Sequence, residues 1–299
     1  MRYFLVAAEH LHFTAAAEEL CISQPALSRS MGLLEEQIGE RLFERAANGV
    51  ALTRYGKILQ RRARLMELEA KYALDEIKAT KMGSGGSLKI GAGPAWLRVI
   101  LPQAILELQR EYLKLQLDLV TGVVETHLTA LMSGKIDLLC GDLDFPNHPE
   151  LVSVHLTDFE FVVVASRNHP LAKKSKVIAA DLVAYQWITL RGDYLGNNRF
   201  TTFFSAQGHS SPEISIFVSP GVSIFGILED SDYLTCIPKQ FLEIAQGAGC
   251  LAIDIEPLWR ASHGIVYRKR SVPEPAISSL VSILKKQFVD LIERSTSAS

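Results

Sequence analysis

Along most of residues 1–82 the apolar positions recur at helical spacing. Three consecutive alanines at 15–17 favour a first helix, for which Thr14 is the expected N-cap. Residues 21–23 break the pattern, and Ser23 can cap a second helix that ends at Gly39. The apolar residues of this second helix lie three or four positions apart, at Leu27, Met31 and Leu34. The pattern predicts a helix, a three-residue turn and a second helix.

The next segments predict a hairpin and a long helix that pairs with another helix. Residues 42–45 and 50–53 flank an Asn48-Gly49 pair, which is a strong signal for a tight turn between strands. Residues 55–82 are highly charged and repeat apolar pairs every seven positions, as helices do when they pair with each other. These pairs are Ile58/Leu59, Leu65/Met66 and Tyr72/Ala73. We therefore expect dimerisation through this helix, followed by a flexible hinge at the Gly- and Ser-rich residues 83–87.

Beyond the hinge, strand-like and helix-like segments alternate. Predicted strands at 87–91, 116–120 and 138–141 are separated by predicted helices at 101–112 and 125–133, which indicates βαβ units and a parallel sheet. Further strands are predicted at 161–164, 187–190, 214–218, 233–237 and 262–268, before a final helix at 275–292. Because this region is large for one sheet, we expect two α/β subdomains with a cleft between them.

The composition excludes several other classes of protein. With 48% hydrophobic and 21% charged residues, the chain is typical of globular proteins. Its longest apolar runs are the size of strands, and residues 3–8 are too short for the core of a signal peptide, so we expect a cytoplasmic protein. The four cysteines have no metal or redox spacing and are expected to be small buried hydrophobes. His10 and His12 would point to different faces of a helix, so we expect no metal there.

The formal net charge of −2 conceals a locally basic segment. Residues 22–64 carry eight basic side chains against four glutamates, whereas residues 87–299 carry 19 basic against 22 acidic. A basic helix-turn-helix followed by a hairpin is typical of proteins that bind double-stranded DNA. Gln24, Ser28 and Arg29 are the donors and acceptors that can pair with base edges in the major groove. From the spacing alone, an ordinary polar surface helix is an equal alternative.

An ordered set of motifs runs through the chain: FTAAAEEL at 13–20, SQPALSR at 23–29, LLEEQIG at 33–39, LFER at 42–45 and LT at 52–53. These motifs resemble the signature of the LysR-type transcriptional regulators, and LP at 101–102, GKIDL at 134–138 and HPL at 169–171 extend the resemblance. The resemblance implies an α/β multidomain protein that binds promoter DNA through a winged helix-turn-helix and senses a small-molecule metabolite. Its effector domain would be similar to type 2 periplasmic-binding proteins.

The resemblance also implies domain bounds. They are a winged helix-turn-helix at 1–54, a dimerising linker helix at 55–82, the hinge at 83–87 and an effector domain at 88–299. Subdomain I would comprise about 88–160 and 265–299, and subdomain II about 161–264.

Site residues follow from the same resemblance, position by position. The residues expected at the DNA are Ser23, Gln24, Pro25, Ser28, Arg29, Arg45 and Thr53, the last as the cap of the linker helix. Those expected at the small-molecule cleft are Pro94, Ala95, Trp96, Val124, Asp142, Thr189, Arg191, Ser219 and Val222. Related regulators of dicarboxylates often carry a cation where this chain has Asp142, which disfavours a strongly anionic effector unless Arg98 or Arg191 substitutes. For Trp96, packing on its own subdomain is favoured over stacking on a ligand ring.

The expected partners are promoter DNA, a small-molecule effector and further copies of the chain, as a homodimer through the linker helix and a homotetramer. RNA polymerase is a further candidate partner, and no cofactor, metal or membrane is expected. Closure of the cleft between residues 93–142 and 189–223 would change how two dimers bend the DNA.

Two alternative functions fit the sequence less well. A solute-binding protein has no use for the helical N-terminal region, and an enzyme would need a nucleophile, base or metal constellation, none of which is recognisable here.

Overall fold

The computed structural model describes residues 1–46, 49–82, 86–219, 224–269 and 275–297. The chain divides into two compact units, Met1–Ser84 and Gly85–Ser299, each of which is described by itself. Of the predicted hinge at 83–87, residues 83–85 lie outside the described residues. Within the described ranges, none of the helices combines the length and the apolar character needed to cross a membrane.

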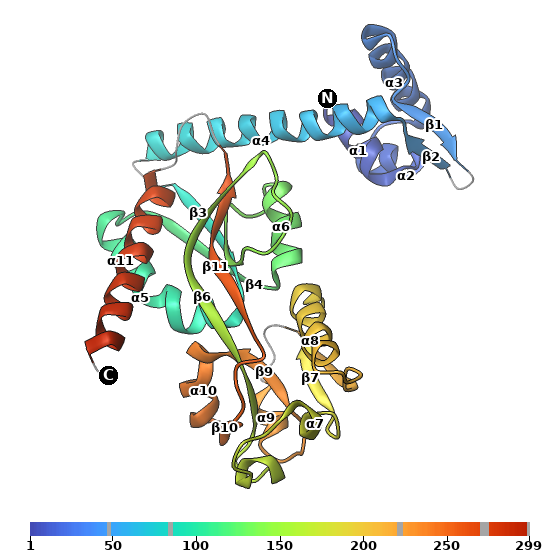
Figure 1. Cartoon of the computed structure of the whole chain (residues 1–299). Coiled ribbons are helices and arrows are strands. Elements are labelled where there is room, and N and C mark those ends of the chain that lie inside the picture. The colour runs from blue at the N-terminus through green and yellow to red at the C-terminus, as the bar shows by residue number, and fades with distance from the viewer. Residues whose placement is uncertain (47–48, 83–85, 220–223, 270–274, 298–299) are drawn as a thin grey trace. The chain divides into compact units, whose positions relative to one another are not determined.

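Unit 1 contains the predicted helix-turn-helix and hairpin (Figure 1). Its elements are α1 (Arg2–His10), α2 (Phe13–Glu19), α3 (Gln24–Ile38), β1 (Phe43–Ala46), β2 (Gly49–Leu52) and α4 (Arg54–Met82). Ser23 caps α3 as predicted, because its Oγ accepts a hydrogen bond from the Ala26 amide at 3.3 Å. The prediction of Thr14 as the cap of α2 was wrong. His12 caps that helix through Nδ1, and the helix begins at Phe13.

Aromatic packing holds the hairpin against the helices of unit 1. The Phe43 ring lies 5.6 Å from the Phe4 ring and 5.2 Å from the Phe13 ring, both edge to face. Strand β1 pairs antiparallel with β2 from Phe43 opposite Leu52 to Ala46 opposite Gly49, which confirms the predicted hairpin. Its tip, residues 47–48, lies outside the described residues.

Helix α4 begins at a side-chain cap and continues well beyond the core of unit 1. The Thr53 hydroxyl donates to the Arg41 carbonyl at 2.6 Å and accepts from the Gly56 amide at 3.1 Å. Ala63 is buried and Leu59 packs against the same core. From Ile58 onward the helix also exposes large apolar side chains, namely Ile58, Met66, Leu74 and Ile77.

Unit 2 is built on a seven-stranded mixed sheet. Its order is β10-β6-β11-β5-β3-β4, and β9 also pairs with β6. The strands are β3 (Ser87–Ala92), β4 (Gln116–Thr121), β5 (Leu138–Asp142), β6 (Leu151–Ser166), β9 (Thr235–Pro238), β10 (Cys250–Ala252) and β11 (Trp259–Arg268). A separate parallel pair is formed by β7 (Trp187–Leu190) and β8 (Ile214–Val218).

The predicted parallel pairing is right for part of this sheet only. Strand β3 runs parallel to both β4 and β5, whereas β6 pairs antiparallel with β9, β10 and β11. Strand β6 also extends over 16 residues, far beyond the predicted 161–164. Its first half alternates between exposed and partly buried positions, so it lacks the continuous apolar run on which the prediction rested.

Helical segments cover the sheet and pack on it in several core regions. These helical segments are η1 (Trp96–Ile100), α5 (Leu101–Glu111), α6 (Val124–Met132), η2 (Pro170–Lys173), α7 (Ala179–Leu182), α8 (Tyr194–Ala206), α9 (Phe225–Leu228), η3 (Lys239–Phe241), α10 (Leu242–Gly247) and α11 (Pro275–Ser297). One core joins α5 and α11 to β3, and others pack α8 or α10 against the far half of β6. Figure 1 shows β6 and β11 running side by side along unit 2 between these regions. The unit is therefore an α/β domain of two halves joined by long strands.

A substitution at Gly264 tests how closely β6 and β11 pack. The register between these strands shifts between His263 and Gly264, and a Cβ added at Gly264 would lie 2.0 Å from the Val154 carbonyl oxygen. A backbone oxygen cannot move aside cheaply, so Gly264→Ala should lower the free energy of unfolding of unit 2 by about 1–3 kcal/mol in urea denaturation. Gly226→Ala, where an added Cβ meets nothing within 4 Å, is the matched control and should not be destabilised. Equal stability of the two variants would contradict this packing.

Candidate functional site

One exposed face at the start of α3 carries most of the predicted DNA-contacting residues. Ser23, Gln24, Pro25, Ser28 and Arg29 are all exposed. The opposite face of the helix is buried in the core of unit 1 through Leu27 and Met31. The Gln24 amide Nε2 donates to the Ser28 hydroxyl at 2.9 Å. The amphipathic pattern of α3 thus leaves its polar N-terminal residues available to a partner.

Arg45 and Thr53, also expected at the DNA, differ in their surroundings. Arg45 is exposed on β1, opposite Val50 of β2. Thr53 is partly buried, and its hydroxyl is engaged in capping α4. Nearby, the exposed Arg54 guanidinium lies 4.5 Å from the centre of the Tyr55 ring. The basic side chains of Arg45 and Arg54 are therefore exposed at the hairpin and at the start of α4.

Unit 2 contains a cavity of about 410 Å³, large enough for a small metabolite. Six of the nine predicted ligand residues line it: Pro94, Ala95, Trp96, Val124, Asp142 and Thr189. Arg191 and Ser219 do not line it, and Val222 lies outside the described residues. The Arg191 guanidinium is directed elsewhere, 5.9 Å from the Phe217 ring.

Trp96 is packed inside the protein, as the favoured interpretation predicts. Only 1% of its surface is exposed, and its ring stacks on Phe159 at 5.9 Å. Its indole Nε1 donates a hydrogen bond to Nδ1 of His263 at 3.2 Å. Trp96 therefore positions His263 at the cavity wall.

His263 was not predicted from the sequence. It is 7% exposed and stacks on Phe159 with ring centres 4.0 Å apart. Burial lowers the pKa of His263 to about 4, so the ring is neutral at pH 7. Because Nδ1 accepts from Trp96, the single ring proton is on Nε2. That Nε2 is buried without a hydrogen-bond partner among the described residues.

Arg199 on α8 is the cation nearest to Asp142, and the sequence did not point to it. Both guanidinium nitrogens Nη1 and Nη2 bind the Asp142 carboxylate, and Nη2 also binds Asp144. The side chains of Arg199 and Asp142 are only 17% and 12% exposed. Burial acts to lower the pKa of Arg199, but the hydrogen bonds and charges of the two aspartates outweigh it and raise that pKa. The ion pair connects α8 to the end of β5.

A second group of carboxyls lies at the first turn of α8. Asp193 caps this helix through a 2.8 Å bond from the Gly196 amide. Glu125 on α6 accepts from the preceding amide, that of Leu195, at 2.9 Å. Burial, with the charges of Glu125 and Asp142, raises the pKa of Asp193 to about 6, although the Gly196 amide and Arg199 act to lower it. Asp193 lines the cavity and titrates close to neutral pH.

The cysteines in the cavity wall are not reactive thiolates. Cys140 and Cys236 line the cavity, and burial raises the pKa of each thiol well above its usual value. Cys140 and Cys250 are buried and Cys236 is partly buried, but the exposed Cys21 contradicts the expectation that all four cysteines are buried. Cys21 lies in the turn before α3 with a φ of +54°.

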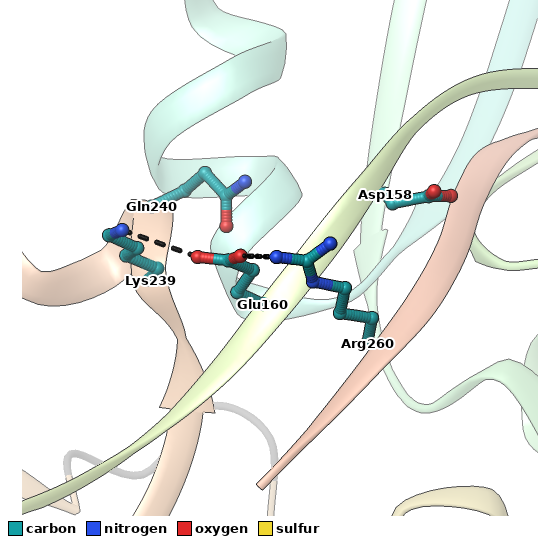
Figure 2. Close-up of a pocket in the computed structure, with 5 residues that line it drawn as sticks. All are labelled: Asp158, Glu160, Lys239, Gln240 and Arg260. Carbon is teal, nitrogen blue, oxygen red and sulfur yellow. Dashed lines mark hydrogen bonds and ion pairs between the residues drawn. The ribbon is translucent and has the colours of Figure 1, made fainter. Parts of the chain in front are cut away.

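A second depression, on the surface of unit 2, is an open cluster of charges (Figure 2). Glu160 lies between Lys239 and Arg260, 3.2 Å from the Lys239 Nζ and 2.5 Å from an Arg260 nitrogen. Figure 2 shows the Asp158 carboxylate on the other side of Arg260, away from Glu160. The two cations are 60% and 73% exposed, so these ion pairs are screened by water and contribute little. The enclosed cavity is the better candidate for ligand binding.

Removal of the Arg199 guanidinium should destabilise unit 2. Arg199→Met leaves Asp142 buried without its cation, and breaking such a pair costs about 3 kcal/mol of unfolding free energy. Urea denaturation at pH 7 measures the loss. The double variant Arg199→Met/Asp142→Asn removes the orphaned charge and should recover part of it. A double variant less stable than Arg199→Met would contradict the pairing.

The raised pKa of Asp193 predicts a specific dependence of stability on pH. As the pH rises from 3.8 to about 6, the unfolded carboxyl ionises before the folded one, so this group removes stability over that window. Asp193→Asn should therefore stabilise unit 2 by about 2–3 kcal/mol above pH 6 and not below pH 4. Asp181→Asn is the control and should have the opposite effect on the free energy of unfolding at neutral pH. Hydrogen bonds from Lys174 and the Ile178 amide lower the pKa of Asp181, so its ionised form stabilises the fold. A pH-independent effect of Asp193→Asn would refute this assignment.

The chain is similar to known regulators over nearly its whole length. The family described as "Bacterial regulatory helix-turn-helix protein, lysR family" matches residues 1–57, and "LysR substrate binding domain" matches residues 81–289. The regulator GbpR of Rhizobium radiobacter is 27% identical over 250 residues, which cover 83% of each chain.

Solved structures show the same fold. Full-length CbnR complexed with its target DNA has a TM-score of 0.60 at 21% identity, covering 95% of this chain and 97% of that one. The effector-binding domain of QuiR in complex with shikimate has a TM-score of 0.60 at 18% identity, covering 69% of this chain and 98% of that one. The chain belongs to the LysR family of bacterial transcriptional regulators, with a helix-turn-helix DNA-binding domain and an effector-binding domain.

Proposed function

We propose that this regulator binds promoter DNA through α3 and the hairpin and responds to a small molecule bound in the cavity of unit 2. The observation that carries the proposal is the cavity itself, which encloses polar groups without partners inside apolar walls. The QuiR effector domain, which has the same fold, binds shikimate. Since the DNA is in the cytoplasm, the protein acts there, as a binding protein and not as an enzyme.

Each DNA-contacting residue has a distinct role in this proposal. Gln24, Ser28 and Arg29 reach base edges in the major groove from the exposed start of α3. Ser23 starts this helix, Pro25 faces the groove beside Gln24, Arg45 approaches the phosphate backbone, and Thr53 caps α4. CbnR, which has the same fold, has been solved on its target DNA.

The active assembly is a homodimer through α4 and, from two such dimers, a homotetramer. The apolar side chains that α4 exposes in unit 1 would be covered by the α4 of a second copy. Two or more helix-turn-helix units on one operator multiply the modest affinity of each for DNA. Binding of the effector would alter how the dimers are disposed on the DNA, and therefore its bending. RNA polymerase is a further partner at such a promoter.

Footprinting tests this coupling. A DNA fragment with the promoter of the protein's own gene should give a different footprint or bend when a cavity ligand is added. Identical footprints and identical bending with free and saturated protein would refute the proposed response.

Arg29→Ala tests the role of α3. If Arg29 contacts a base, the substitution should weaken operator binding by about 1–3 kcal/mol, and if it contacts phosphate, it should reduce the salt dependence of binding for every sequence. Fluorescence anisotropy over a range of salt concentrations separates the two. Arg110→Ala, which removes an exposed arginine of α5 in unit 2, is the matched control and should bind like the unmodified protein. Unchanged binding by Arg29→Ala would exclude both roles.

A further inference from the structure

The amides in the first turn of α8 already donate hydrogen bonds to carboxylates of the chain. A helix N-terminus offers unpaired amides and a positive end of the dipole, both of which favour an anion. In α8, a helix of 13 residues, Glu125 takes the Leu195 amide and Asp193 takes the Gly196 amide. A carboxylate on a ligand would have to displace one of them.

The buried guanidinium at the cavity is occupied in the same way. Arg199 uses Nη1 and Nη2 on Asp142 and shares Nη2 with Asp144. Arg98 also lines the cavity, but it is exposed and lies 6.0 Å from the Phe241 ring, where water screens its charge. An anionic ligand would therefore enter a cavity whose buried charges are mainly negative.

A separate observation indicates what the cavity lacks. The Nε2 of His263 is a buried donor in the cavity wall, and no acceptor reaches it among the described residues. A buried donor without a partner costs free energy that a ligand acceptor would recover. The Asp142 and Asp193 carboxylates line the same cavity and offer acceptors to a ligand donor. A hydroxyl group can accept and donate, whereas an ammonium only donates and a carboxylate only accepts.

We propose that the effector is an uncharged compound with an apolar ring or chain and more than one hydroxyl group. One hydroxyl accepts from Nε2 of His263, and others donate to the carboxylates of Asp142 and Asp193. The apolar part packs against the hydrophobic wall formed by Val123, Val124, Ile237, Phe225 and Phe241. The assignment rests on the proposed function, because it takes the cavity as the effector site.

Calorimetric titration of the full chain with matched probes tests the class of effector. The three probes of a set share one dihydroxylated six-membered ring and differ in a single substituent, which is –CH2OH, –COO⁻ or –CH2NH3⁺. We expect the alcohol to bind about tenfold or more tightly than the carboxylate, a difference of about 1.4 kcal/mol. Equal or tighter binding of the carboxylate or the amine, or no binding of any alcohol, overturns the proposal.

A cavity-filling variant separates this proposal from the proposed function. Val123 is buried in the cavity wall, so Val123→Phe should abolish binding of the alcohol probes. If the variant binds them as tightly as the unmodified protein does, the cavity is not the effector site and both statements fail. If binding is lost in the variant but the carboxylate is the preferred probe, only the assignment of an uncharged effector fails.

Asp142→Asn tests why carboxylates are disfavoured. The substitution weakens the hold on Arg199 while Asp144 still pairs with it, so Arg199 becomes available to a ligand anion. The preference for alcohol over carboxylate should fall about tenfold. Glu160→Gln, in the surface cluster of Figure 2, is the matched control and should leave the preference unchanged. An unchanged preference in Asp142→Asn overturns the role of this ion pair.

Discussion

The pairing of β6 with β11 is the interaction on which the effector-binding domain depends. It runs from Trp259 opposite Phe161 to Arg268 opposite Leu151, with one shift of register beside Gly264. Side chains from this pair enter the core on the α5 and α11 side, and the far half of β6 enters the cores beneath α8 and α10. The same two strands supply Phe159, Phe161 and His263 to the cavity wall. The fold and the cavity therefore both depend on one hydrogen-bonded ribbon, β6 paired with β11.

Polar contacts add a second connection across the cavity. Asp142 and Asp144 at the end of β5 bind Arg199, and Glu125 on α6 binds the first turn of α8. Burial makes the Asp142–Arg199 contact costly to break, because an unpaired charge would remain in a region of low dielectric. Charged groups on the opposite wall thus hold α8 in position. A ligand that binds to those groups would compete with their contacts to α8. This gives the cavity a physical route to a change of conformation.

Local patterns predicted the DNA-binding unit well and the cavity only in part. Ser23 caps α3, and Leu27 and Met31 form its buried face. These signals are local in the sequence, so the sequence was sufficient to place the helix and its exposed face. Helix α8 was not predicted, because Gly196, Asn197 and Asn198 lower its helix propensity. Without that helix, nothing in the sequence distinguished Arg199 from Arg191, and Asp142 is 57 residues away from its true partner. The hydrogen bond from Trp96 to His263 spans 167 residues and has no local signal at all.

The ribbon of β6 and β11 also limits how descendants of this protein can diverge. Adding or losing one residue in either strand would turn its side chains to the opposite face beyond that point. Cavity-facing residues would then exchange places with those packed on the other side of the sheet. New effector preferences are therefore expected to arise by substitution in place along these strands, while changes in chain length accumulate in the connections outside them.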